Sequence, residues 1–260
     1  MRNLKITLQY NGKDYCGWQK QPNALGIQGT VEKAIYEITK EEVKVTASGR
    51  TDAGVHALGQ VANFKTECNI PADRVPDALN AKLPKDISVI SCEEVDIDFH
   101  ARYNACGKTY RYLIYNKPYR SPLYKDLSYH VRYDLDLDKI RSEAKYLIGT
   151  HDFGGFMSSG SSVKDTVRTI YDVDIKENDG MISIEVSGNG FLYNMVRIIV
   201  GTLVDIGRGR IKHNMEEIIK ANPDKILVTM HALPDETKKT VAEELAKDSW
   251  KSINAVKNNK

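Results

Sequence analysis

The residue types best suited to chemistry are concentrated in one segment, SGRTDAGVHALGQ, at residues 48–60. A carboxylate at Asp52 can attack an electrophilic carbon or abstract a proton, and the guanidinium of Arg50 can pair with it or with a phosphate. The interspersed glycines permit left-handed backbone and close approach by a ligand. The segment is not a phosphate-binding P-loop, because no Lys-Ser/Thr pair follows its glycines. Spacing alone also fits an ordinary turn with an ion-paired aspartate, and His56 alone is more often structural than catalytic.

The elements around this segment predict a mixed α/β first half. Apolar residues alternate over 4–10, 43–47, 60–66 and 87–90, which predicts strands. Residues 30–39 and 71–81 have helical spacing, the second with a proline at its start. The SGRTDAG segment therefore lies in a loop between two strands, where side chains that bind or react are commonly found.

The second half repeats this mixture. Strands are expected at 109–115, 167–175 and 182–186, and the Asn178-Asp179-Gly180 turn between the last two predicts a hairpin. Helices are expected at 137–148, 191–206 and 215–221. We predict an α+β protein of two similar α/β domains with antiparallel or mixed sheets, covering residues 1–105 and 106–260.

Charge is informative through its distribution. The net charge of +2 says little, but residues 100–132 hold seven basic residues against one acid, Asp126, interleaved with seven tyrosines. Basic side chains neutralise phosphates, and tyrosine rings stack on unpaired bases. A basic outer face of a sheet with half-buried tyrosines fits the composition equally well.

Several functional classes are disfavoured. No run of about 18 apolar residues is present, which disfavours a membrane-spanning helix. The N-terminus MRNLKITLQY alternates apolar and polar residues and lacks the apolar core of a signal peptide, which disfavours secretion. Free thiols at Cys16, Cys68, Cys92 and Cys106 would fit a cytoplasmic, reducing compartment. The four cysteines form no C-x-x-C pair, so no zinc site is predicted.

GRTDAGVHA at residues 49–57 resembles the signature of the tRNA pseudouridine synthase A family. Further stretches match that family in order, and together they cover about residues 4–221. They are YNGKDYCGWQKQ (10–21), ALNAKLPKDI (78–87), FHARYNACGKTYRY (99–112), HDFGGF (151–156) and NGFLYNMVRIIVGTL (189–203).

The resemblance implies a function and a site. Members isomerise uridine to pseudouridine at positions 38, 39 and 40 of the tRNA anticodon stem-loop, as homodimers, with two domains joined across a central active-site cleft. It implies that Asp52 is the catalytic carboxylate, that Arg50 fills the gap in the stem or holds the flipped nucleotide, and that Tyr110 stacks on the uracil. Arg197 would pair with Asp52, and an arginine within the apolar run FLYNMVRIIVGTL independently favours an acidic partner. No metal or cofactor is implied.

The resemblance ends near Asn222. The family's usual final segment, T-A-P-A-x-G-L-x-L-x-x-V-x-Y, is absent, and residues 241–246 read as helical. We expect lower stability or activity unless this atypical tail covers the sheet edge left behind. Two other functions stay open: a binding module such as an RNA chaperone, and a small-molecule hydrolase or lyase that uses Asp52 and His56.

Overall fold

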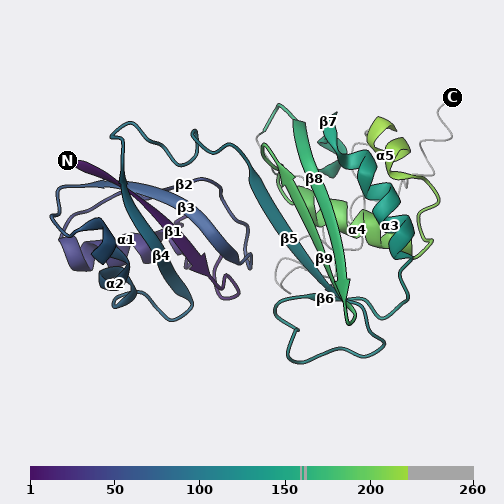
Figure 1. The fold of residues 1–260 in the computed structure, drawn as a ribbon, viewed down its shortest axis with the longest axis horizontal. Coiled ribbons are helices and arrows are strands. Elements are labelled where there is room, and N and C mark those ends of the chain that lie inside the picture. The colour runs from purple at the N-terminus through teal and green to yellow at the C-terminus, as the bar shows by residue number, and fades with distance from the viewer. Residues whose placement is uncertain (159, 161–162, 222–260) are drawn as a thin grey trace. The chain divides into compact units, whose positions relative to one another are not determined.

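The computed structural model describes residues 1–158, 160 and 163–221. The chain divides into two compact units, Met1–Ala105 and Cys106–Lys260 (Figure 1). Each unit packs helices against its own sheet, and this confirms the predicted α+β class. The atypical tail and its expected helix at 241–246 lie outside the described residues. No helix in the described part of the chain is both long and apolar enough to cross a membrane.

The first unit is a four-stranded antiparallel sheet in the order β2-β3-β1-β4. Its strands are β1 (Arg2–Tyr10), β2 (Thr46–Ala47), β3 (Ala57–Thr66) and β4 (Ile87–Val95), and its helices are α1 (Ile27–Thr39), η1 (Ala72–Arg74) and α2 (Val75–Asn80). Leu4, Ile6 and Leu8 are fully buried on alternate positions of β1 and share a core with residues of α1 and α2. The period-two pattern of the sequence therefore selects the face that the helices cover.

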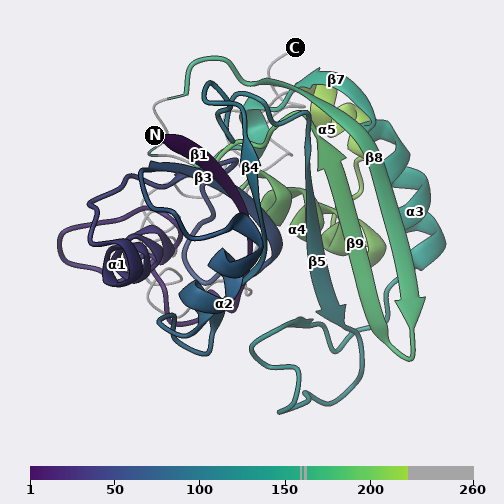
Figure 2. The same cartoon turned by 60° about the vertical axis from the view of Figure 1, so that its left-hand side comes forward.

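The second unit is a five-stranded mixed sheet in the order β6-β5-β9-β8-β7. Its strands are β5 (Lys108–Tyr115), β6 (Tyr129–His130), β7 (Gly149–Asp152), β8 (Val167–Asn178) and β9 (Met181–Gly188), and only the β5–β6 pair is parallel. Its helices are α3 (Leu137–Ala144), η2 (Lys145–Leu147), η3 (Gly154–Phe156), α4 (Met195–Gly207) and α5 (Met215–Ala221). Figure 2 shows α3, α4 and α5 beside this sheet.

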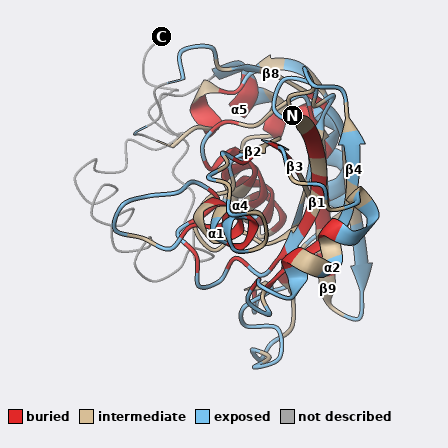
Figure 3. Ribbon diagram, turned by 90° about the vertical axis from the view of Figure 1, so that its left-hand side faces the viewer, coloured by how far each residue is buried: buried red, intermediate tan, exposed pale blue. Residues whose placement is uncertain are grey.

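Helix α4 forms the centre of the second core. Every residue of α4 is buried except Arg197, Gly201 and Asp205, which recur at i, i+4 and i+8 (Figure 3). Such a spacing follows one stripe of a helix. Arg197 therefore lies on the one face of α4 that the core does not cover.

Several predicted elements have other bounds in the structure, and three of them show why. The expected strand at 43–47 shrinks to Thr46–Ala47, because side chains of α1 bind the backbone of Val45: Gln28 donates to its carbonyl and Glu32 accepts from its N–H. The helix expected from residue 191 begins at Met195, after Asn194 with φ 59°. The helix expected from residue 30 begins earlier, at Ile27.

Candidate active site

The Asp52 loop (residues 48–56) connects β2 to β3, as the sequence predicts. A turn closes within it, where the N–H of Val55 donates to the carbonyl of Asp52 at 3.2 Å and Gly54 has φ +74°. Asp52 is half-buried and Arg50 is exposed. The aspartate therefore sits on an ordered turn, with the arginine nearer to solvent.

A second loop, residues 11–26 between β1 and α1, holds the Asp52 loop by its backbone. The N–H of Trp18 donates to the carbonyl of Thr51 at 3.0 Å, and the N–H of Gly54 donates to the carbonyl of Tyr15 at 3.2 Å. The hydroxyls of Tyr10 and Thr51 share a hydrogen bond of 2.9 Å. The bonded residues Thr51 and Gly54 lie before and after Asp52 in the sequence, so the backbone position of Asp52 depends on the 11–26 loop.

Two glycines allow the loops to touch without side chains between them. A Cβ built on Gly17 would lie 2.5 Å from the carbonyl oxygen of Thr51 and 3.1 Å from the carbonyl carbon of Asp52. A Cβ built on Gly12 would lie 2.0 Å from the carbonyl oxygen of Val55. Only glycine fits at such a close approach, and Gly17 also has φ +91°.

The tyrosine at position 15 anchors the 11–26 loop in the first core. Its side chain is buried, and its hydroxyl donates to the carboxylate of Asp86 at 2.8 Å. Burial, followed by that hydrogen bond, raises the pKa of Tyr15 well above its ordinary value. Tyr15 is therefore a neutral hydrogen-bond donor throughout the physiological range.

His56 has a structural contact in this arrangement. Its Nδ1 accepts a hydrogen bond of 3.3 Å from the N–H of Gly12, which connects the Asp52 loop to the start of the 11–26 loop. This contact favours the structural reading of His56 over the catalytic one.

The other two predicted site residues belong to the second unit. Tyr110 is half-buried on β5, and its ring meets Phe191 edge-on, with centroids 5.1 Å apart and an angle of 84°. Tyr112 lies two residues along the strand, on the same face. Burial raises the pKa of Tyr112 to about 12, and the charge of Arg197 opposes that rise. Arg197 of α4 is thus an electrostatic neighbour of the face of β5 that carries Tyr110.

Comparison with known proteins decides the family. The model of the family described as tRNA pseudouridine synthase matches residues 6–104 and 144–238. The chain belongs to the tRNA pseudouridine synthase family. The matched ranges contain Arg50, Asp52 and Arg197, whereas Tyr110 lies between them. The second range runs to residue 238, past Asn222, where the sequence motifs predicted the end of the resemblance.

Individual relatives are similar over most of their length. The chain is 52% identical over 226 residues to tRNA pseudouridine synthase A of Acetivibrio thermocellus, which covers 86% of this chain and 93% of the relative. It is 47% identical over 234 residues to tRNA pseudouridine synthase A of Thermoanaerobacter sp. strain X514, which covers 90% and 96%. It is 50% identical over 226 residues to tRNA pseudouridine synthase A 2 of Clostridium perfringens, which covers 86% and 93%.

The structure thus groups the predicted family residues into two sets. Arg50 and Asp52 share one loop of the first unit, and Tyr110 and Arg197 lie in the second unit. The pairing of Arg197 with Asp52 stays a prediction. In the described residues, no group of three or more His, Cys, Asp or Glu side chains could hold a metal ion.

The role of the 11–26 loop was not predicted from the sequence. The features that could have indicated it are the two glycines and the aromatic residues in YNGKDYCGW at residues 10–18. A pattern of glycines with large aromatics marks a loop that packs closely on another backbone, but it does not say which one.

Proposed function

We propose that this chain isomerises uridine to pseudouridine at positions 38, 39 and 40 of the tRNA anticodon stem-loop, with Asp52 as the catalytic carboxylate. The observation that carries the proposal is the motif GRTDAGVHA at 49–57, in a chain that belongs to the tRNA pseudouridine synthase family. Membership of that family favours a uridine isomerase over a binding module and over a small-molecule hydrolase.

The reaction sets the chemical demands on the site. The C1′–N1 bond breaks, the uracil turns, and a C1′–C5 bond forms, while C5 loses its proton and N1 gains one. In one route the Asp52 carboxylate adds to the sugar or the base. In the other route it abstracts the 2′ proton and a glycal forms. Both routes need a carboxylate whose position is fixed, and the hydrogen bonds to Thr51 and Gly54 supply such a fixed backbone.

The remaining family residues receive roles in binding. The target nucleotide must leave the stem, at a cost of a few kcal/mol. In this proposal Arg50 holds the flipped nucleotide and Tyr110 stacks on the uracil. Arg197 pairs with Asp52, and a guanidinium beside that carboxylate favours the ionised form of the carboxylate. The half-buried position of Arg197 suits a pair that forms at a surface rather than within the core.

The basic tyrosine-rich segment supports an RNA-binding surface. Tyr103 is 77% exposed and Tyr119 is 85% exposed, and Arg120 and Lys125 are also exposed. These exposed rings and cations favour contact with unpaired bases and phosphates. Tyr110, Tyr112 and Tyr129 of the same segment are half-buried against the second core, as the alternative of a sheet face with half-buried tyrosines expects. We further propose that the active form is a cytoplasmic homodimer, and sedimentation of the purified chain tests its oligomeric state.

The central experiment measures isomerisation by the Asp52→Asn variant. We expect no tritium release from tRNA that carries 5-tritiated uridine, while tRNA binding persists, because the amide can neither attack nor abstract a proton. Asp77→Asn is the matched control, since the Asp77 carboxylate is an 81% exposed surface group on α2. Carbodiimide mapping of the product identifies the modified positions. Turnover by Asp52→Asn near the parental rate would refute the assignment of Asp52.

A further inference from the structure

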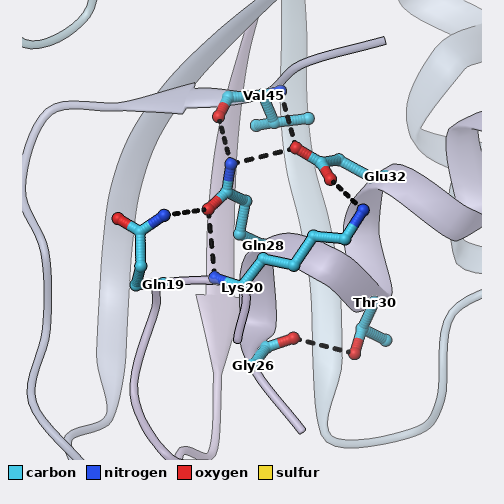
Figure 4. A network of polar contacts seen from close by, with 7 residues as sticks. All are labelled: Gln19, Lys20, Gly26, Gln28, Thr30, Glu32 and Val45. Atoms are coloured by element: carbon cyan, nitrogen blue, oxygen red, sulfur yellow. Dashed lines mark hydrogen bonds and ion pairs between the residues drawn. The ribbon is translucent and has the colours of Figure 1, made fainter. Parts of the chain in front are cut away.

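The side chain of Gln28 is a buried carboxamide whose hydrogen-bonding groups are all in use. Gln28 is 6% exposed, at the start of α1. Its Nε2 donates to Glu32 Oε1 at 2.9 Å and to the carbonyl of Val45 at 3.2 Å. Its Oε1 accepts from the N–H of Lys20 and from Nε2 of Gln19, both at 3.1 Å (Figure 4). A carboxamide has two donors and two acceptor positions, so this one is saturated.

The two backbone segments that this carboxamide connects both adjoin the Asp52 loop. Lys20 follows Trp18 by two residues, and the Trp18 N–H donates to the carbonyl of Thr51. Val45 directly precedes β2, and β2 leads into the Asp52 loop. Gln28 thus links residues 17–20, which contact the Asp52 loop, to Val45, which lies just before β2 and the start of that loop.

Glu32 strengthens the same link, one helical turn further along α1. Its Oε1 accepts from the N–H of Val45 at 3.2 Å, and its Oε2 pairs with Nζ of Lys20 at 3.3 Å (Figure 4). The Glu32 side chain is only 11% exposed, so its bonds are screened less than those of a surface carboxylate. Val45 therefore has two anchors on α1. Residues 17–20 have these side-chain anchors in addition to two backbone hydrogen bonds, from the N–H of Ile27 to the carbonyl of Gly17 at 3.1 Å and from the N–H of Gln28 to the carbonyl of Trp18 at 2.9 Å.

Movement of the first segment reaches Asp52 directly. The backbones of Gly17 and Thr51 touch with no side chain between them, since a Cβ on Gly17 would lie 2.5 Å from the Thr51 oxygen. A shift of residues 17–20 therefore displaces the Thr51–Asp52 peptide rather than being absorbed by a flexible side chain.

We propose that Gln28 is a positioning residue for the isomerisation, which holds residues 17–20 against the Asp52 loop and so sets the place of the Asp52 carboxylate. The inference rests on the proposed function of Asp52. Gln28 does not touch the substrate in this role, and its removal lowers the rate of the chemical step while leaving tRNA affinity nearly intact.

The test compares Gln28→Ala with Asn3→Ala. Both changes delete a buried amide in the first unit: Asn3 is 1% exposed, and its Nδ2 donates to the carbonyls of Asp96 and Phe99 at 2.9 Å. The Oδ1 of Asn3 accepts from Nδ2 of Asn63 at 3.0 Å, and none of these three partners belongs to the Asp52 loop. Asn3 lies near the start of β1. Tyr10 lies at the other end of this strand, and its hydroxyl bonds to Thr51 of the Asp52 loop. We therefore expect the control to lose stability with little effect on that loop.

Turnover of tRNA is measured below the unfolding temperature of each variant. We expect Gln28→Ala to lower kcat by about tenfold or more with KM within about twofold, because sub-ångström to ångström displacements of a reacting group cost rate. Asn3→Ala keeps kcat within about twofold. Equal kcat values for the two variants would show that Gln28 has only a structural role.

Gln28→Met is the second variant. It keeps the length and the packing of the side chain but deletes its four hydrogen bonds, so we expect the same fall in kcat as for Gln28→Ala, with KM little changed. A folded Gln28→Met variant with kcat within about twofold of the parent overturns the proposal. This variant also decides the matter if Gln28→Ala fails to fold.

Asp52→Asn is run in the same assay to separate the two proposals. If Asp52→Asn is inactive and Gln28→Ala matches Asn3→Ala, only the positioning role fails. If Asp52→Asn retains turnover, the proposed function of Asp52 fails, and the role of Gln28 fails with it.

Discussion

Replacing Gly17 with alanine tests directly whether the contact between the two loops supports catalysis. The new Cβ would lie 2.5 Å from the Thr51 carbonyl oxygen, whereas ordinary contact begins at 3.4 Å. The backbones of the 11–26 loop and the Asp52 loop must therefore separate by about 0.9 Å, which is the difference between these two distances. The obstacle is backbone rather than the end of a flexible side chain, so the strain cannot be relieved by a rotamer change.

This displacement has an expected kinetic size. A misplacement of about 1 Å costs on the order of 100-fold in rate. That factor corresponds to about 2.7 kcal/mol in the activation free energy. We expect kcat for pseudouridine formation to fall by this order, with the KM for tRNA changed much less, because in the proposed function basic side chains, and not Gly17, contact the phosphates.

Alanine at Gly209 is the matched control for backbone strain. Gly17 has φ +91° and Gly209 has φ +69°, so both substitutions place a side chain in the left-handed region, at about 1–2 kcal/mol each. A Cβ on Gly209 meets nothing within 4 Å. Gly209→Ala should therefore lose stability but keep kcat. Single-turnover tritium release on both folded variants gives the comparison, and similar rates for the two would contradict the role of the contact.

Two further predictions concern pH and salt. Burial raises the pKa of Tyr112 to about 12 from an ordinary value of 10.0, so between these values the folded chain keeps a proton that the unfolded chain releases. Its contribution to stability is complete below pH 10.0 and is lost as the pH rises towards about 12, by at most about 1.4 kcal/mol per pH unit. Urea unfolding at several alkaline pH values measures the free energy of unfolding, which should fall less steeply with pH for Tyr112→Phe than for the parent. The same pH dependence in both would argue against the burial of this phenol. For the exposed cations, Arg120→Ala with Lys125→Ala should weaken tRNA binding and reduce the slope of log affinity against log salt by about 1–2. Fluorescence titration over a salt series measures that slope, and an unaltered slope would remove this segment from the RNA-binding surface.

Local patterns predicted well the elements that form regular strand ladders and tight turns. The strand β9 follows its apolar alternation, with Ile182, Ile184 and Val186 buried. The turn at Asp179 and Gly180 has positive φ at both residues, as the Asn-Asp-Gly sequence requires. In these cases the preference of the sequence and the packing of the sheet agree.

Elements that depend on distant side chains were predicted less well. Residues 43–47 alternate like a strand, yet Gln28 and Glu32 of α1 occupy the N–H and carbonyl of Val45 that a ladder would use. At α4, the apolar run begins before the helix, because Asn194 adopts a left-handed conformation just ahead of Met195. Periodicity reports which face is buried, but it does not report which group satisfies each backbone donor and acceptor.

The same distinction applies to the candidate site. The sequence can indicate Asp52 as a reactive group, because a carboxylate among glycines between two strands is an unusual choice of residues. It cannot indicate what holds that carboxylate, because Gly17 contacts Thr51 through backbone atoms and leaves no complementary pair of side chains to recognise. Gln28 acts one step further away, through the segment that contains Gly17. A substitution there that leaves the chain folded yet slows isomerisation would therefore reveal a part of the active site that no inspection of reactive residue types can find.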